Sequence, residues 1–267
     1  MRFGYDGASY SGWARQPGRR TIEGEIRRGL VRVGMARSAA GLEVASRTDR
    51  GVSARANALA LSSDLSGPEL LGRLNRIDPP IFFTAAAAVP ASFRVRRAVR
   101  RTYRYFEPGG FRSAARVRSA ARLFSGTVDV RSLGRGLPGD GPVWRTVESV
   151  RVRRVRGGAT VEVRAPSFVW GMVRKVVAAL REVDAGRLTV ARLRGALKGR
   201  SRLTLPMAEP EALVLWEVEC GIPWTWAWRG PSRGQASRAR RLARERWARG
   251  EVLRGISGVR RAVRSAD

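Results

Sequence analysis

The feature that most constrains the fold is a pair of short segments in which apolar and polar residues alternate. Residues 150–155 and 160–163 alternate valine with polar residues, and Gly157-Gly158 lies between them. A period of two gives a strand one apolar and one polar face, and a glycine pair between two such runs is typical of a hairpin. We therefore expect an antiparallel hairpin with one buried face.

Helical periodicity marks other parts of the chain. In residues 21–33, Ile22, Ile26 and Leu30 share one face, and Thr21 suits the N-cap position. We expect further helices at 114–124, 169–180 and 190–197, strands at 1–6, 42–45, 57–61, 102–106 and 213–218, loops at 46–55 and 134–142, and a break at Pro79-Pro80. Strands and helices mix without strict βαβ alternation, so the sequence predicts an α+β fold.

The charge balance indicates a polyanionic partner. The 267 residues include 52 basic and 22 acidic side chains, a net charge of +30. Only Lys175 and Lys198 are lysines, and arginine suits phosphate and base stacking better than lysine does. We expect a nucleic acid in preference to a membrane surface or an acidic protein. A coding bias towards arginine also contributes to this composition.

The composition excludes several kinds of chemistry. The chain has no histidine, which excludes Ser-His-Asp and Cys-His catalysis and zinc sites that need imidazole. Its one cysteine, Cys220, excludes internal disulfides and thiolate clusters and fits a reducing cytosol, so we expect a cytoplasmic protein. No apolar run is long enough for a transmembrane helix, and we expect no membrane association and no metal.

Three segments carry candidate chemistry. Asp49 lies between Arg47 and Arg50 in the loop Ser46–Val52. A carboxylate beside cations stays ionised and can act as a nucleophile or base on a substrate whose phosphates the arginines hold. The same pattern is common as a surface ion pair, and this loop alone does not separate the two readings.

The second segment is Arg100–Phe106, in which Tyr103 and Tyr105 point to one face of a strand. Such tyrosines suit stacking on an extruded base, or a buried tyrosine pair in the core. The third is Ser167–Val177, where Arg174 lies near a helix start. A cation there opposes the helix dipole, so we expect a partner such as Asp49, or else a solvated arginine. Asp6, in the loop after the first strand, suits a turn cap.

In this order, six motifs resemble the tRNA pseudouridine synthase A family, which modifies the anticodon arm of tRNA. They are YDGASYSGWARQ, TIEG, SRTDRGVSA, VPASFRVR, RRTYRYF and SFVWGMVRKVV, and the resemblance runs from Tyr5 to about Glu219. The resemblance implies a pseudouridine synthase fold: two α/β halves with merged, mainly antiparallel sheets and a basic cleft between them. The halves are expected at 1–106, with the nucleophile loop, and 107–222, followed by a basic extension at 223–267.

The resemblance also implies residue roles. Asp49 matches the catalytic aspartate, and Arg174 matches the arginine that pairs with it. Tyr103 matches the tyrosine that stacks on the target base, and Arg47, with Arg50 beside it, is expected to bind substrate RNA. The implied reaction converts uridine to pseudouridine at positions 38–40 of tRNA, with base flipping, as a homodimer, with no cofactor and no metal.

Some readings stay open at this stage. The chain departs from the family pattern at Ser53, where members commonly carry histidine. Three alternatives remain: a pseudouridine synthase that acts on another RNA, a catalytically inactive RNA-binding relative, and a basic protein that compacts DNA or RNA in general. The terminal segment 229–267 carries 12 arginines against three acidic residues; it is expected either as a basic helix at 237–249 or as a solvated tail.

Overall fold

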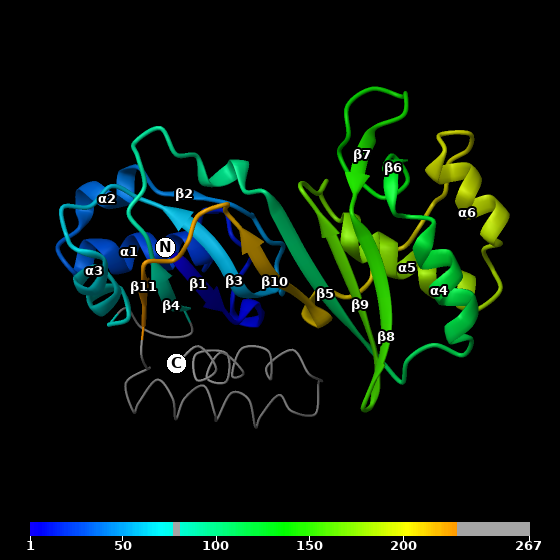
Figure 1. The fold of residues 1–267 in the computed structure, drawn as a ribbon, viewed down its shortest axis with the longest axis horizontal. Coiled ribbons are helices and arrows are strands. Elements are labelled where there is room, and N and C mark those ends of the chain that lie inside the picture. The colour runs from blue at the N-terminus through cyan, green and yellow to red at the C-terminus, as the bar shows by residue number, and fades with distance from the viewer. Residues whose placement is uncertain (77–80, 229–267) are drawn as a thin grey trace. The chain divides into compact units, whose positions relative to one another are not determined.

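The computed structural model describes residues 1–76 and 81–228, and the chain divides into two compact units. The first comprises Met1–Val99 and the chain from Val214, and the second comprises Arg100–Leu213. Each unit combines strands and helices, so the predicted α+β class is confirmed (Figure 1). The boundary expected at residue 106 differs from this division, because β5 (Arg100–Pro108) lies wholly in the second unit.

The first unit is built on a mainly antiparallel sheet. Its strands follow the order β11-β4-β1-β3-β10, and the short β2 also pairs with β3. Only β10 and β3 run parallel to each other within this unit's described strands. The strands are β1 (Arg2–Tyr5), β2 (Glu43–Val44), β3 (Ser53–Ala60), β4 (Ile81–Ala86), β10 (Leu213–Glu219) and β11 (Trp226–Ala227).

The helices of the first unit follow local capping signals. In α1 (Ile22–Arg32), the predicted cap is confirmed, because Thr21 Oγ1 accepts the Gly24 N–H at 3.3 Å. Ile22, Ile26 and Leu30 are fully buried, as their spacing predicts. The sequence analysis missed α2 (Ala36–Ala40) and α3 (Gly67–Leu74). The single turns η1 (Gly7–Ser9) and η2 (Val95–Arg97) complete the unit.

The second unit contains the predicted hairpin. β8 (Ser149–Val155) and β9 (Gly158–Ala165) pair antiparallel, and β9 pairs with β5 on its other side. Figure 1 shows α4 (Ala114–Arg122) and α5 (Met172–Asp184) along one face of these strands. A separate ribbon, β6 (Gly126–Asp129) with β7 (Trp144–Val147), α6 (Val190–Leu197) and the turn η3 (Pro210–Ala212) complete this unit.

Two expected boundaries were wrong. The loop expected at 46–55 ends earlier, because β3 begins at Ser53 and pairs with both β1 and β10. The helix expected from Val169 begins at Met172, because Gly171 adopts a φ of +79°, outside the helical region. The expected break at Pro79-Pro80 and the expected helix at 237–249 lie outside the described residues.

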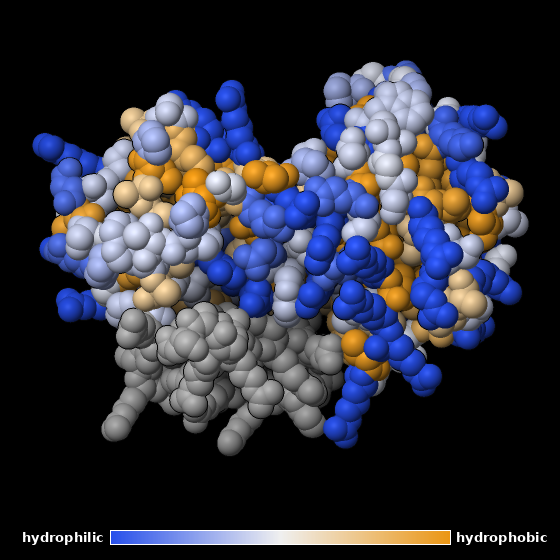
Figure 2. Space-filling view, viewed as in Figure 1, coloured by the Kyte–Doolittle hydropathy of each residue, from blue (hydrophilic) through white to orange (hydrophobic). Residues whose placement is uncertain are grey.

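On the face drawn in Figure 2, the second unit shows many strongly hydrophilic side chains with hydrophobic residues between them. On β8, three arginines are exposed: Arg151, Arg153 and Arg154. Within residues 1–76 and 81–228, no helix has the length and apolar character needed to cross a membrane. The same residues contain no group of three acidic or cysteine side chains placed to hold a metal ion.

Candidate active site

The loop that carries Asp49 is fixed to the first unit by its inward-facing residues. The Thr48 hydroxyl lies 2.8 Å from the Tyr5 hydroxyl, and the Thr48 carbonyl accepts the Trp13 N–H at 3.0 Å. Asn57, fully buried on β3, donates from its side chain to the Ser46 carbonyl at 2.9 Å. Ser46 and Thr48 are buried as a result. Arg47, which lies between them, is exposed.

The residues that the sequence singles out are less buried than Ser46 and Thr48. Arg47 and Arg50 are exposed, and Asp49 is half-buried. Neither arginine forms an ion pair with a carboxylate among the described residues. The Asp49 carbonyl accepts the Val52 N–H at 3.2 Å across a turn in which Gly51 has a φ of +83°. The loop therefore has a defined shape that presents two cations and one carboxylate.

Two glycines allow other chain segments to approach this loop closely. At Gly12, with a φ of +93°, a Cβ atom would lie 3.1 Å from the Thr48 carbonyl oxygen and 3.2 Å from the Asp49 carbonyl carbon. At Gly7, it would lie 2.1 Å from the Val52 carbonyl oxygen. The Gly7 N–H also donates to Ser53 Oγ at 3.1 Å, so the serine that replaces the common histidine anchors this segment. Asp6 caps it, as predicted, by accepting the Ala8 N–H.

In the second unit, Tyr103 packs against the segment that leads into α5. It is buried on β5, opposite Val163 of β9. Its ring meets the Phe168 ring edge-on, with centroids 5.0 Å apart. The Arg101 side chain donates to the Pro166 carbonyl, which fixes the same segment two residues earlier. Residues 166–168 are therefore held along β5 at the position of Tyr103.

Arg174 lies in the first turn of α5 and is anchored through its backbone and its side chain. Its Nε donates to the Ala208 carbonyl at 2.5 Å, and its own carbonyl accepts the Ala208 N–H at 3.4 Å. A cation at this end of a helix opposes the dipole, and the Ala208 carbonyl supplies a compensating acceptor. The expected partnership with Asp49 stays a prediction.

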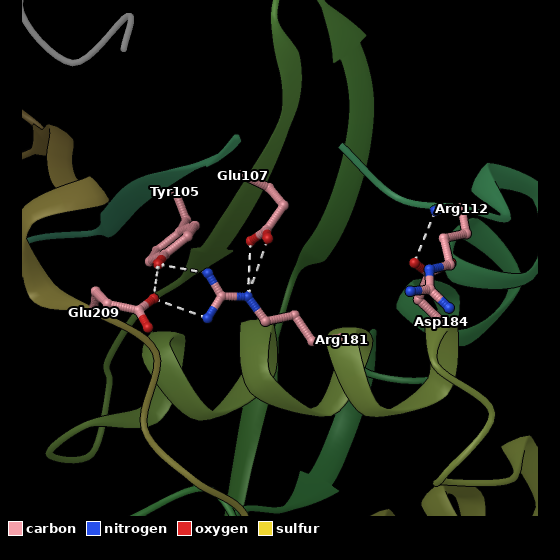
Figure 3. A network of polar contacts seen from close by, with 6 residues as sticks. All are labelled: Tyr105, Glu107, Arg112, Arg181, Asp184 and Glu209. Atoms are coloured by element: carbon pink, nitrogen blue, oxygen red, sulfur yellow. Dashed lines mark hydrogen bonds and ion pairs between the residues drawn. The ribbon is translucent and has the colours of Figure 1, made fainter. Parts of the chain in front are cut away.

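A polar network lies two turns further along α5 (Figure 3). Arg181 Nε donates to both carboxylate oxygens of Glu107, at 2.9 and 3.1 Å. Its terminal nitrogens donate to Glu209 at 2.8 Å and to the Tyr105 hydroxyl at 3.1 Å, and that hydroxyl donates to Glu209 at 3.0 Å. One guanidinium thus joins β5, α5 and the segment before η3.

Burial and charge act in opposite directions on the acids of this network. Burial raises the pKa of Glu107 above its usual value despite the guanidinium beside it. Glu209 is mostly exposed, and a hydrogen bond from its own backbone, followed by the bond from Arg181, lowers its pKa to about 2. Burial also raises the pKa of Tyr105. At neutral pH the network therefore contains an ionised Glu209 and a neutral tyrosine.

The sequence analysis missed this network, although a signal was present. Tyr103, Tyr105 and Glu107 are two residues apart on one strand and share a face. Arg174 and Arg181 are seven residues apart, so they share a helix face over two turns. The two candidates from the resemblance, Tyr103 and Arg174, thus lie on the elements that Arg181 joins. The signal is therefore the spacing: Glu107 shares a strand face with Tyr103, and Arg181 shares a helix face with Arg174.

Comparison with known proteins defines the class to which this fold and site belong. The family model described as tRNA pseudouridine synthase matches residues 120–219. A tRNA pseudouridine synthase A from Thermococcus kodakarensis is 37% identical over 266 residues, covering 97% of this chain and 96% of the relative. That of Thermococcus onnurineus is 38% identical, covering 82% and 83%.

One solved structure, described as the crystal structure of a Cbf5-Nop10-Gar1 complex, is similar at a TM-score of 0.35 and 13% identity. The match covers 79% of this chain and 56% of that one. The sequence relatives are decisive: this chain belongs to the tRNA pseudouridine synthase A family. It is an isomerase that acts on uridine in tRNA.

Proposed function

We propose that the chain converts uridines of the tRNA anticodon stem-loop, at positions 38–40, to pseudouridine, with Asp49 as the catalytic aspartate. The observation that carries this proposal is the loop at residues 46–52. Hydrogen bonds at Ser46 and Thr48 hold it in a shape that exposes Arg47 and Arg50 and leaves Asp49 half-buried. Such a loop presents one carboxylate to a substrate whose phosphates contact the arginines.

The reaction requires no added reagent, because the substrate and product are isomers. The bond between N1 and C1′ breaks, the uracil turns, and C5 bonds to C1′. The proton on C5 then leaves, and N1 gains a proton. We propose that Asp49 acts on the ribose, either by attack at C1′ or by removal of the proton at C2′.

The target base must leave the helical stack to reach the aspartate. Extrusion of a base costs a few kcal/mol. We propose that Arg47 offsets part of this cost by filling the vacated position, while Arg50 contacts phosphate. The burial of Tyr103 against Phe168 supports a role as a fixed platform on which the extruded uracil stacks.

Arg174 is the proposed partner of Asp49. Its Nε bond to the Ala208 carbonyl fixes the direction of the rest of the guanidinium. A guanidinium held in this way keeps a neighbouring carboxylate ionised and oriented. We also propose that the protein acts as a cytoplasmic homodimer, supported by the family resemblance and by a composition with one cysteine; light scattering at several concentrations tests the dimer.

The test is a site-resolved pseudouridine map of an unmodified tRNA transcript incubated with the protein. Wild type should give product in the anticodon arm, and Asp49→Asn and Asp49→Ala should give none while still binding tRNA. Asp64→Asn, which changes an exposed carboxylate of the same unit, is the matched control and should react like wild type. Tyr103→Phe keeps the ring and tests the hydroxyl.

Each alternative has its own outcome in this experiment. Turnover in Asp49→Asn near that of wild type would remove Asp49 from the chemistry. Product formed only on another RNA would show that the substrate is that RNA and not the anticodon arm of tRNA. Binding without product on any RNA would indicate an inactive relative. Equal retention of duplex DNA and tRNA at matched salt would indicate a general basic protein instead.

A further inference from the structure

Trp170 is an exposed aromatic residue next to the candidate catalytic elements. More than half of its surface, 55%, is accessible. Among the described residues, Trp170 and Trp144 are the two exposed aromatic side chains. Single exposed apolar residues are ordinary on protein surfaces, so exposure alone assigns no role. The surroundings of Trp170 distinguish it.

An arginine is stacked on the tryptophan. The Arg135 guanidinium carbon lies 4.8 Å from the centroid of the Trp170 ring. The Arg135 N–H also donates to the Trp170 carbonyl at 3.1 Å, so the two residues are joined through their backbones as well. Among the described residues, no carboxylate forms an ion pair with Arg135. The Arg135 guanidinium can therefore contact the ring and still donate hydrogen bonds to a ligand.

The loop that carries Arg135 is shaped in advance. Asp129 Oδ1 accepts the N–H groups of Arg131 and Val143, at 2.9 and 2.7 Å. The Arg131 guanidinium donates to three carbonyls across the loop: Leu137, Pro138 and Gly141. A loop with its backbone acceptors satisfied in this way loses little conformational freedom when a ligand binds.

A second cation lies beneath this loop. Lys175 Nζ donates to the carbonyls of Ser132 and Gly134, at 3.3 and 3.0 Å. Gly134 directly precedes Arg135, so this hydrogen bond places the two cations near each other. Burial, and then the charge of Arg135, lowers the pKa of Lys175. The tryptophan therefore lies beside two positive charges, a combination that suits a ligand with a flat face and a negative backbone.

The chain connects this surface to the proposed chemistry. Trp170 follows Phe168, which contacts Tyr103, by two residues, and two residues span at most about 7 Å. It precedes Arg174 by four residues, with Gly171 turning the backbone into α5 between them. A nucleotide on Trp170 would therefore be a near neighbour of a base on Tyr103.

We infer that Trp170 and Arg135 form a stacking subsite for an unpaired base of the RNA that neighbours the target uridine, with Arg135 also contacting its phosphate. The inference rests on the proposed function, in which Tyr103 receives the target. Only an unpaired base offers a free face to an aromatic ring, since bases inside a duplex are covered by their neighbours. The subsite selects targets whose neighbouring base is able to leave the stack.

The experiment compares Trp170→Ala and Trp170→Phe with the control Trp144→Ala, which removes the other exposed aromatic residue of the same unit. The dissociation constant for a tRNA transcript and the single-turnover rate of pseudouridine formation are measured at one salt concentration. Stacking of a base contributes about 1–3 kcal/mol, so Trp170→Ala should weaken binding about 5- to 150-fold. Trp170→Phe and Trp144→Ala should stay within about threefold of wild type.

Two further measurements identify the contacts. Abasic tRNAs are prepared that each lack one of the bases flanking the target. One of them should bind wild type and Trp170→Ala with the same affinity, because the base that stacks on Trp170 is already missing from it. Arg135→Ala should reduce the slope of log affinity against log salt by about 0.7, the value of one phosphate contact on a single strand. Circular dichroism melts of each variant show that the fold is retained.

Three results would overturn the inference: wild-type affinity in Trp170→Ala, equal losses in Trp170→Ala and Trp144→Ala, or a loss in Trp170→Ala that persists with every abasic tRNA. If the slope of log affinity against log salt is unchanged in Arg135→Ala, Arg135 does not contact a phosphate. Failure of the proposed function is seen separately, because wild type itself would then form no pseudouridine in the anticodon arm.

Discussion

The Arg181 network makes a quantitative prediction about stability. Arg181→Met keeps much of the side-chain stem but removes the hydrogen bonds to Glu107, Glu209 and Tyr105. A hydrogen bond to a charged group contributes about 1.5–3 kcal/mol, and leaving a fully buried ion without its partner costs about 3–5 kcal/mol. The Glu107 side chain is 12% exposed and that of Arg181 is 30% exposed, so water screens part of this interaction.

The contact with Glu209 adds little to that sum. Its side chain is 67% exposed, and ion pairs in such positions contribute at most about 1 kcal/mol. We therefore expect Arg181→Met to lower the free energy of unfolding by about 2–4 kcal/mol, mostly through the stranded Glu107 carboxylate. Urea unfolding followed by circular dichroism measures this loss. Arg187→Met, at an exposed arginine just after the same helix, is the control and should unfold like wild type.

The same substitution should also affect turnover. Arg181 binds Glu209, and the preceding residue, Ala208, supplies the carbonyl that holds Arg174. Loss of this support should lower the single-turnover rate more than it weakens tRNA binding, because Arg174 is proposed to orient the catalytic carboxylate. Arg181→Lys keeps the charge without the planar fork and should recover part of the rate.

A double variant tests the physical reasoning behind these numbers. In Arg181→Met with Glu107→Gln, no carboxylate is stranded, so most of the lost stability should return. Turnover should stay low, because the contact with Glu209 is still absent. If Arg181→Met alone unfolds at the same urea concentration as wild type, the network does not stabilise the unit and the reasoning is refuted.

Two further predictions concern pH and backbone shape. Because the folded pKa of Glu209 is about 2, against 4.5 for the free side chain, its contribution to stability should be present above pH 4.5 and disappear as the pH falls towards 2. Unfolding of Glu209→Gln and wild type should thus differ at pH 6, by less than about 1 kcal/mol, and the difference should shrink below pH 4.5 and vanish only as the pH falls through about 2. Gly12→Ala should cost about 1–2 kcal/mol through its positive φ and should also reduce turnover, because the new Cβ presses on the Asp49 loop. Gly18→Ala, also at positive φ but with no atom within 4 Å, should lose stability without losing turnover.

Elements with a strong local signal could be predicted from the sequence. The Gly157-Gly158 hairpin needs only alternation and a glycine turn, and α1 needs only its cap and a stripe of apolar residues. β3 was placed too late because its sequence, SARANALA, is rich in small and polar residues with weak strand preference. Pairing with β1 and β10, distant in sequence, makes it a strand.

The candidate site divides along similar lines. Asp49, Tyr103 and Arg174 were singled out as candidates through motifs in a fixed order, which a single sequence displays. Glu107 and Glu209 were missed, because their partner Arg181 is 74 and 28 residues away: register along β5 and α5 marks Glu107 and Arg181, but it does not show that the two meet. Such networks depend on which strand face meets which helix face, and this is decided by packing.

The shortage of acidic residues connects structure and function in this chain. Against 52 basic residues there are only 22 acidic ones, and several carboxylates serve two arginines each. Glu217 pairs with Arg2 and Arg55, and Glu162 with Arg104 and Arg164. Paired arginines of this kind are parts of the fold, and a ligand's phosphate must compete with their carboxylate partners.

Three arginines on the two proposed RNA-binding surfaces form no ion pair with a carboxylate among the described residues. Arg47 and Arg50 extend from the Asp49 loop, and Arg135 lies on Trp170. Because only such residues can exchange solvent counterions for phosphates, they should set the salt dependence of RNA binding. Neutralising Arg135 should therefore lower the salt slope, whereas neutralising Arg104, which is paired with Glu162, should change stability and leave the slope unaltered. A slope that fell equally in both variants would show that the carboxylate pairing does not decide which arginines meet the RNA.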